Sequence, residues 1–322
     1  MRVTDAPGAG PPLGAAAGAV VAGMIVALQL QSNAQLGIAL DSALAAAVVA
    51  FASGAVVLGV VLLATGRWRR AAAIGGRHGG DHPQPWWLLG GATGGLYVAA
   101  GAAAAPVLGL TLLTLSLVAG QLSGSIVTDA LGLSPQGRMR AGRIRVLSAA
   151  VGVLGVAIAS GGQAITGEVG APGWPVALAV AVVGACSTLG VAANGRLGVR
   201  LGEPLVAAFI SVLVALVFSL ALASVALLAS GSGIRSPWDA PPLAWSGGAL
   251  GALWLTASIG LVRRLGVLVL LVGALTGQLL GAVALDVAAP LGERTVDLPR
   301  LAGVAAMAVA VVLASVGSRF RS

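Results

Sequence analysis

The sequence predicts an all-α polytopic membrane protein with ten transmembrane helices, arranged as two inverted five-helix repeats. Three observations lead to this fold class. Hydrophobic residues form 58% of the 322-residue chain and charged residues only 9%, with a mean hydropathy of +1.00. That apolar content exceeds what a soluble core requires and suits a lipid environment. The arginines gather in short segments between apolar stretches, and several polar patterns occur twice.

Ten apolar segments are each long enough to cross about 30 Å of hydrocarbon as a helix. They lie near 14–35, 42–65, 86–105, 108–131, 144–160, 175–193, 204–228, 243–262, 265–288 and 299–318. The first has no signal-peptide cleavage site and is followed by nine more, so we interpret it as a membrane helix. Only Pro106 and Arg263–Arg264 mark the links between spans three and four and between spans eight and nine. We expect the helices of each of these pairs to be antiparallel neighbours.

The positions of the arginines predict the orientation in the membrane. Ten spans place both termini on one side, and fifteen of the 18 arginines fall on that side; the other side has only Arg235, Arg294 and Arg300. The positive-inside rule therefore predicts that both termini are cytoplasmic. The net charge of +8 is explained by this pattern, and no nucleic-acid partner is expected. The single Cys186 excludes an internal disulfide.

An internal repeat is the second organising feature of the chain. The Gly90-Gly91 and Gly120-Gln121 pairs recur 157 residues later as Gly247-Gly248 and Gly277-Gln278. The segment 31–37 aligns with 192–198 at a difference of 161. These matches predict two units, residues 1–160 and 161–322. Because each unit has five spans, the second enters the membrane from the opposite side, as in the inverted repeats of many secondary transporters.

Four stretches of the first unit carry a family resemblance. They are QLQSNAQLG at 29–37, FASG at 51–54, PWW at 85–87 leading into Gly90-Gly91, and Gly120-Gln121 through DALG at 129–132. On these residues the chain resembles the YdcZ-like family of the drug/metabolite transporter (DMT) superfamily, as a fused tandem of two five-helix units. The resemblance implies a DMT/EamA-like fold and a bacterial inner-membrane carrier that exports a small metabolite or toxic compound. It names no substrate.

Six residues are predicted to bind substrate. Gln121 and Gln278 fall near the bilayer midplane, where an unpaired amide is costly, and they mark the meeting point of two half-paths. The alternative is that they join helices as interhelical hydrogen bonds. The paired aromatics Tyr97 and Trp254 would stack a flat or cationic cargo, or pack over glycine faces. The remaining two candidates, near the ends of spans one and six, are Asn33 and Asn194, with helix capping or kinking as the alternative.

Two carboxylates are predicted to act in coupling or gating. Asp129 and Asp286 lie near helix C-termini, where the helix dipole opposes a negative charge, so each needs a neighbouring arginine or a proton. Salt bridges that fix the helix ends are the alternative. The pairs Gly120/Gly124 and Gly277/Gly281 predict close backbone contacts of spans four and nine with neighbouring helices.

The predicted function is secondary-active transport by alternating access, through a cavity lined by spans one, three, four, six, eight and nine. A flippase for a lipid-linked intermediate and a non-transporting scaffold are the alternatives. The expected partners are a small-molecule or lipid-linked substrate and the bilayer, with a monomer or a homodimer as the assembly. No phosphate-binding loop or catalytic constellation occurs, so no enzyme activity and no cofactor are predicted. The cluster His78, Asp81 and His82 is interpreted as a solvated loop, and no metal is predicted.

Overall fold

The computed structural model describes residues 13–70, 84–133, 137–138, 142–165, 173–230, 235–236, 240–291 and 296–319, and these parts contain helices and no strand. The α-helices are α1 (Leu13–Leu40), α2 (Ala43–Thr65), α4 (Leu89–Ala130), α5 (Arg143–Ile165), α6 (Gly173–Leu201), α7 (Pro204–Ser230), α8 (Gly247–Ala288) and α9 (Leu298–Arg319). Two short 3-10 helices, η1 (Pro85–Leu88) and η3 (Pro242–Ser246), lead directly into α4 and α8.

The described elements are all helical, as expected, and the helices have the length and polarity of membrane spans. Among the described residues, six helices are long and apolar enough to cross a bilayer, and two shorter apolar helices lie at Val272–Ala288 and Leu298–Ala314. Large aliphatic side chains such as Val60, Leu63 and Leu228 are exposed on the outer faces, where lipid would cover them. The ten expected spans are not all separate elements, because spans three and four are two helices joined at a kink within the 42-residue α4, and spans eight and nine lie within the 42-residue α8.

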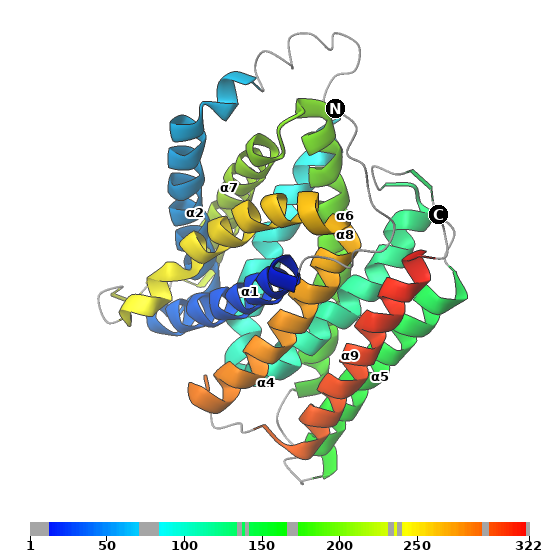
Figure 1. Ribbon diagram of the computed structural model, residues 1–322. Coiled ribbons are helices and arrows are strands. Elements are labelled where there is room, and N and C mark those ends of the chain that lie inside the picture. The colour runs from blue at the N-terminus through cyan, green and yellow to red at the C-terminus, as the bar shows by residue number, and fades with distance from the viewer. Residues whose placement is uncertain are drawn as a thin grey trace.

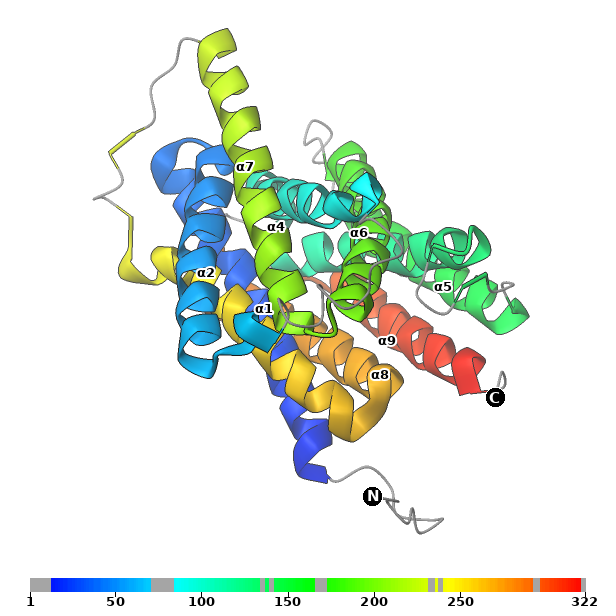
Figure 2. The same cartoon turned by 90° about the horizontal axis from the view of Figure 1, so that it is seen from above.

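Helix α4 is bent sharply into two arms. Pro106 lies inside it, and Gly109 has φ 73° and ψ 164°, a backbone conformation outside the helical region that favours glycine. Figures 1 and 2 show that α8 also turns back on itself, between its yellow first arm and its orange second arm. Each long helix therefore supplies two differently directed segments. In α4 these segments are the two spans that the sequence predicted, joined at the kink.

The helices pack in pairs, and each of the main pairs joins a helix of the first half of the chain to a helix of the second half. The most extensive contacts join α4 to α6 and α1 to α8, followed by α5 to α9 and α2 to α7. The α2–α7 pair lies at one edge and the α5–α9 pair at the opposite edge, with α1, α4, α6 and α8 between them (Figures 1 and 2). The second arm of α4 forms the centre of the core, since Leu110, Leu112, Leu113 and Leu115 are fully buried.

The GxxxG pairs lie at the main helix crossings, as predicted. A β-carbon on Gly120 would overlap the carbonyl of Ala181 in α6, and a β-carbon on Gly277 would overlap the carbonyl of Val20 in α1. Ala181 and Val20 differ by 161 positions, and the two glycines by 157, so the same crossing is built twice. Only glycine lets the backbones approach this closely. Gly124 and Gly281 extend these contacts along the same helices.

Candidate transport cavity

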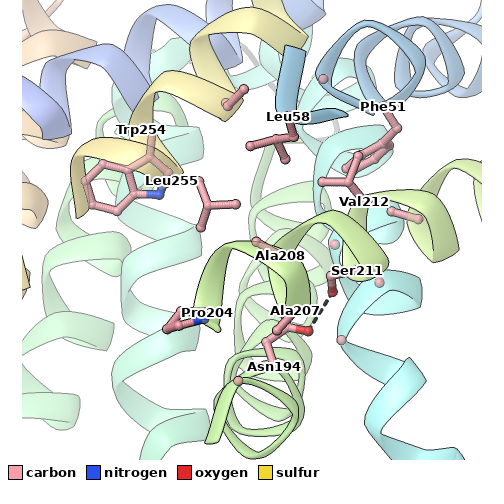
Figure 3. A pocket seen from close by; sticks show the side chains of 18 of the residues that line it. Phe51, Leu58, Asn194, Pro204, Ala207, Ala208, Ser211, Val212, Trp254 and Leu255 are labelled. Atoms are coloured by element: carbon pink, nitrogen blue, oxygen red, sulfur yellow. Dashed lines mark hydrogen bonds between the residues drawn. The ribbon is translucent and has the colours of Figure 1, made fainter. Parts of the chain in front are cut away.

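One cavity of about 760 Å³ lies between the two halves. Helices α2, α6 and α7 form its walls together with the first arms of α4 and α8, and Gln29 of α1 also reaches it. Figure 3 shows Phe51 and Leu58 of α2 and Trp254 and Leu255 of α8 around this space, with Asn194 of α6 below them. Its lining extends to Gly202 and Pro204, so the cavity reaches the connection between α6 and α7.

Two glycine pairs let the helices around the cavity approach closely. The first glycine of each pair faces an asparagine: a β-carbon on Gly90 would overlap Asn194 Oδ1, and one on Gly247 would overlap Asn33 Oδ1. The second glycine of each pair faces a helix backbone, because Gly91 packs on α7 at Ser211 and Gly248 packs on α2 at Ala50. Each contact between a glycine of one half and a residue of the other half therefore has a counterpart at the equivalent positions of the repeat.

The two asparagines differ in their surroundings. Asn194 lines the cavity, and its Oδ1 accepts a hydrogen bond of 2.5 Å from Ser211 Oγ (Figure 3). Asn33 is only 1% exposed, and among the described residues neither atom of its amide has a hydrogen-bond partner. The cavity therefore lies at the α6 end of this arrangement, while the equivalent position on α1 is closed.

The end of α1 is held closed by contacts with the other half. Gln31 Nε2 donates to the Ala289 carbonyl at 2.8 Å, and the hydroxyls of Ser32 and Ser246 are 3.0 Å apart. At the corresponding positions α6 has Ala192 and Ala193, whose side chains cannot form hydrogen bonds. The two halves thus differ in sequence just before the asparagine that is buried in one half and lines the cavity in the other.

Tyr97, Gln121 and Gln278 come together behind the cavity. Trp254 lines the cavity, whereas Tyr97 packs both against its wall at Val98 and against the central core. The Tyr97 hydroxyl interacts with the side chains of both Gln278 and Gln121. The Nε2 of Gln278 has no hydrogen-bond partner among the described residues. Three of the predicted site residues therefore form one polar cluster, in which Gln278 is buried and Tyr97 and Gln121 are half-buried.

Asp286 closes the bend of α4. Its Oδ1 accepts from the Leu110 N–H at 2.8 Å and its Oδ2 from the Thr111 N–H at 2.7 Å. These two amides begin the second arm of α4, where a helix leaves N–H groups without internal partners and favours a negative charge. A β-carbon on Gly109 would lie 3.2 Å from Asp286 Oδ2 and 3.6 Å from Arg300 Nη1, so an arginine lies at the same point.

Asp129, the counterpart of Asp286, pairs with an arginine of α5. Arg145 Nη1 lies 2.6 Å from Asp129 Oδ2, and Arg145 Nη2 donates to Ser125 Oγ at 3.2 Å. Helices α5 and α9 cross where Gly152 packs on Met307, and Ser148 bonds Ala310 beside this crossing. Arg145 lies seven residues before Gly152 and Arg300 seven residues before Met307, so the two arginines occupy equivalent places in the pair. Each half thus places an aspartate of its long helix beside an arginine of its last helix.

A family model describes the chain over most of its length. The model of the DMT_YdcZ family, described as "putative inner membrane exporter, YdcZ", matches residues 15–158 and again 175–313. The chain belongs to the DMT_YdcZ family. The two matches fall in the two halves, so the chain is a tandem of YdcZ-like units in a family of inner-membrane exporters, which is not an enzyme family. A search of curated proteins found no match.

Part of the cavity of this YdcZ-family protein was missed by sequence reasoning. We expected spans one, three, four, six, eight and nine as walls, but α2 and α7 line the cavity and the second arms of α4 and α8 do not contribute described lining residues. The FASG stretch at 51–54 held the missing signal, because Phe51 and Gly54 both face the cavity. No group of three metal-ligating side chains occurs among the described residues, and His78, Asp81 and His82 lie outside them.

Proposed function

We propose that this YdcZ-family protein is a secondary-active exporter of small molecules that works by alternating access. In this proposal ten membrane crossings form two inverted five-helix repeats, residues 1–160 and 161–322, and the arms of α4 and α8 supply two crossings each. The observation that carries it is a contrast. The helix contacts recur with the halves exchanged, as at Gly120 and Gly277, whereas Asn194 lines the cavity and its counterpart Asn33 is buried.

An inverted-repeat carrier is expected to have one open and one closed end in any single conformation. Two equivalent halves that face opposite sides of the membrane generate two states by exchanging conformations. Here the α6 end opens to the cavity, and the equivalent α1 end is closed by Gln31, Ser32 and the buried Asn33. In the other state we expect the α1 end to open and the α6 end to close.

The two aspartates would support this exchange. Asp286 stabilises the bend of α4 on the side that is closed, through the amides of Leu110 and Thr111. Its counterpart Asp129 lies on the side of the cavity mouth and pairs with Arg145. In our proposal both carboxylates gate the ends of the path, while Gln121, Gln278 and Tyr97 form the polar midpoint that the cargo passes.

The direction of opening follows from the expected topology. The cavity reaches the α6–α7 connection, beside Gly202 and Pro204, which the expected topology places on the side with most arginines and both termini. Under the positive-inside rule this side is the cytoplasm, so the cavity is in position to load cargo for export. The family description names an exporter and gives no support to a lipid-linked cargo or a flippase.

The proposal is tested in a strain that lacks the gene, screened for growth against toxic metabolites and drugs. The wild-type chain should restore growth on at least one compound, and Gln121→Ala and Gln278→Ala should each abolish the rescue at equal expression. Gly14→Leu, which lies outside the cavity in open space, is the control and should retain it. Full rescue by both glutamine variants would contradict the role of the polar cluster.

A separate test addresses the inverted arrangement. Single cysteines introduced at Asp81→Cys and Glu168→Cys, in a Cys186→Ala background, should be labelled from opposite sides of the membrane. Labelling from the same side would contradict two inverted five-helix units, whatever the result of the growth screen.

A further inference from the structure

The cavity wall carries no charge among its described residues. Only four of these side chains, Gln29, Asn194, Ser211 and Trp254, have a polar atom, and the others are glycine, alanine, proline or larger apolar residues. A charged molecule held here would lose its hydration and find no opposite charge in the described wall, which is costly. The wall therefore favours a molecule without net charge.

The charges of Arg67 and Glu203, at the rim of the cavity, neutralise each other. Glu203, between the lining residues Gly202 and Pro204, pairs with Arg67 at 3.8 Å, and the two side chains are 13% and 31% exposed. Neither charge is thus left to attract an ion into the cavity. This pair also joins the end of α2 to the α6–α7 connection, so it belongs to the rim and not to the wall.

The polar atoms of the wall suit carbonyl or hydroxyl groups. Asn194 uses its Oδ1 to accept from Ser211, which leaves the Nδ2 group as a donor. Gln29 brings a second amide from α1, with its Nε2 2.8 Å from where a β-carbon of Gly251 would lie. Two neutral amides on different helices would orient one or two neutral polar groups of a ligand.

The space is large enough for a drug-sized molecule. Small-molecule pockets commonly measure about 300–1,000 Å³, and this cavity measures about 760 Å³. Its large side chains are apolar or aromatic, with Phe51 and Leu58 on α2 and Trp254 and Leu255 on α8 (Figure 3). Gly94 leaves part of the wall open, because a β-carbon there would have no atom within 4 Å.

We propose that the cavity binds uncharged, largely apolar organic molecules that carry one or two carbonyl or hydroxyl groups. This inference rests on the proposed function in taking the cavity as the site that the cargo enters. It adds the class of the cargo, and it separates this chain from a carrier of organic cations that holds its cargo with an acidic side chain in the wall.

The experiment measures equilibrium binding to the full chain in lipid nanodiscs, with empty nanodiscs subtracted. Three ring systems, phenyl, indolyl and naphthyl, are each used as the neutral alcohol, the sulfonate and the trimethylammonium compound. Wild type is compared with Gly94→Leu, which fills the cavity, and with Gly14→Leu, which makes the same change in open space elsewhere. Gly198→Leu is a second filling variant, since its β-carbon would have its nearest described neighbours at 3.8 and 3.9 Å.

We expect at least one neutral alcohol to bind saturably, and each filling variant that folds to weaken its binding about tenfold or more, with no change in Gly14→Leu. The charged compounds should bind about tenfold more weakly than the alcohol of the same ring. The inference is overturned if a sulfonate or ammonium compound binds in a Gly94-dependent manner as tightly as the alcohol, or if no alcohol shows binding that the filling variants weaken. Either result would contradict the class of cargo and would not bear on the transport proposal, which the growth screen tests separately.

Discussion

The ends of α1 and α6 are built on the same plan but have different surroundings. Both carry an asparagine that packs on the first glycine of a Gly-Gly pair in the other half. At the end of α1 the asparagine is buried, and Gln31 and Ser32 form hydrogen bonds to the other half. At the end of α6 the asparagine faces a cavity, and Ala192 and Ala193 replace the two polar residues.

This comparison teaches that the repeat preserves packing and varies the polar contacts. The contacts of Gly91 and Gly120, and of their counterparts Gly248 and Gly277, must be kept in both halves, because a β-carbon there would overlap a helix backbone that cannot move aside. Hydrogen bonds at the helix ends contribute about 1 kcal/mol each, which is enough to bias two conformations without breaking the fold. The predictions below disturb first the shared packing and then the features that differ.

The largest effect is expected from the shared glycines. Gly120→Val and Gly277→Val should each prevent a stable fold, because the added side chain would enter the backbone of α6 or α1. Size-exclusion chromatography in detergent and thermal unfolding measure this. Gly94→Val is the control and should remain folded, since nothing lies near its β-carbon position. If only one of the two crossing variants lost its fold, the equivalence of the crossings would be wrong.

The next effect separates the two aspartates. Asp286→Asn should lower stability by about 1–3 kcal/mol, because an amide offers a single oxygen to the N–H groups of Leu110 and Thr111 and leaves one without an acceptor. Asp129→Asn should cost less, because the amide oxygen can still accept from Arg145, which also bonds Ser125. Thermal unfolding of both variants gives the comparison. A larger loss for Asp129→Asn would contradict this ranking.

Accessibility of the two asparagine positions gives a direct test of the open and closed ends. In a Cys186→Ala background, Asn194→Cys should react with a water-soluble maleimide about tenfold faster than Asn33→Cys. Asn33 is buried, so the end of α1 must open before the reagent can reach a cysteine there. Labelling rates in membranes are measured by mass shift, with denatured protein as the reference. Equal rates at the two positions would argue against one open and one closed end.

The smallest effect sharpens the same comparison. Replacing Gln31→Ala and Ser32→Ala makes the end of α1 match that of α6 and removes two polar contacts worth about 1 kcal/mol each. The labelling rate of Asn33→Cys should then rise several-fold. Ser123→Ala, which removes only a hydrogen bond within its own helix, is the control and should leave the rate unchanged. An unchanged rate in the double variant would show that these contacts do not hold the end closed.

Much of the fold follows from the sequence because its signals are local or periodic. Apolar length predicts membrane helices, and the repeated Gly120/Gly124 and Gly277/Gly281 pairs predict close helix crossings without knowledge of the partner. The pairing of Tyr97 with Trp254 as equivalent positions was also readable from the register. Which of the two would reach a cavity was not, because the two halves adopt different surroundings around the same residues.

The sequence by itself determined that the chain is a membrane protein written as two related halves, and where each half places its glycines, amides and acids. Only the tertiary structure decided which end is open, that α2 and α7 form walls, and that Asp286 accepts from Leu110 and Thr111. The reason is physical. These features depend on the bend at Gly109 and on contacts between residues more than 150 positions apart, and no local pattern records how two separate helices align.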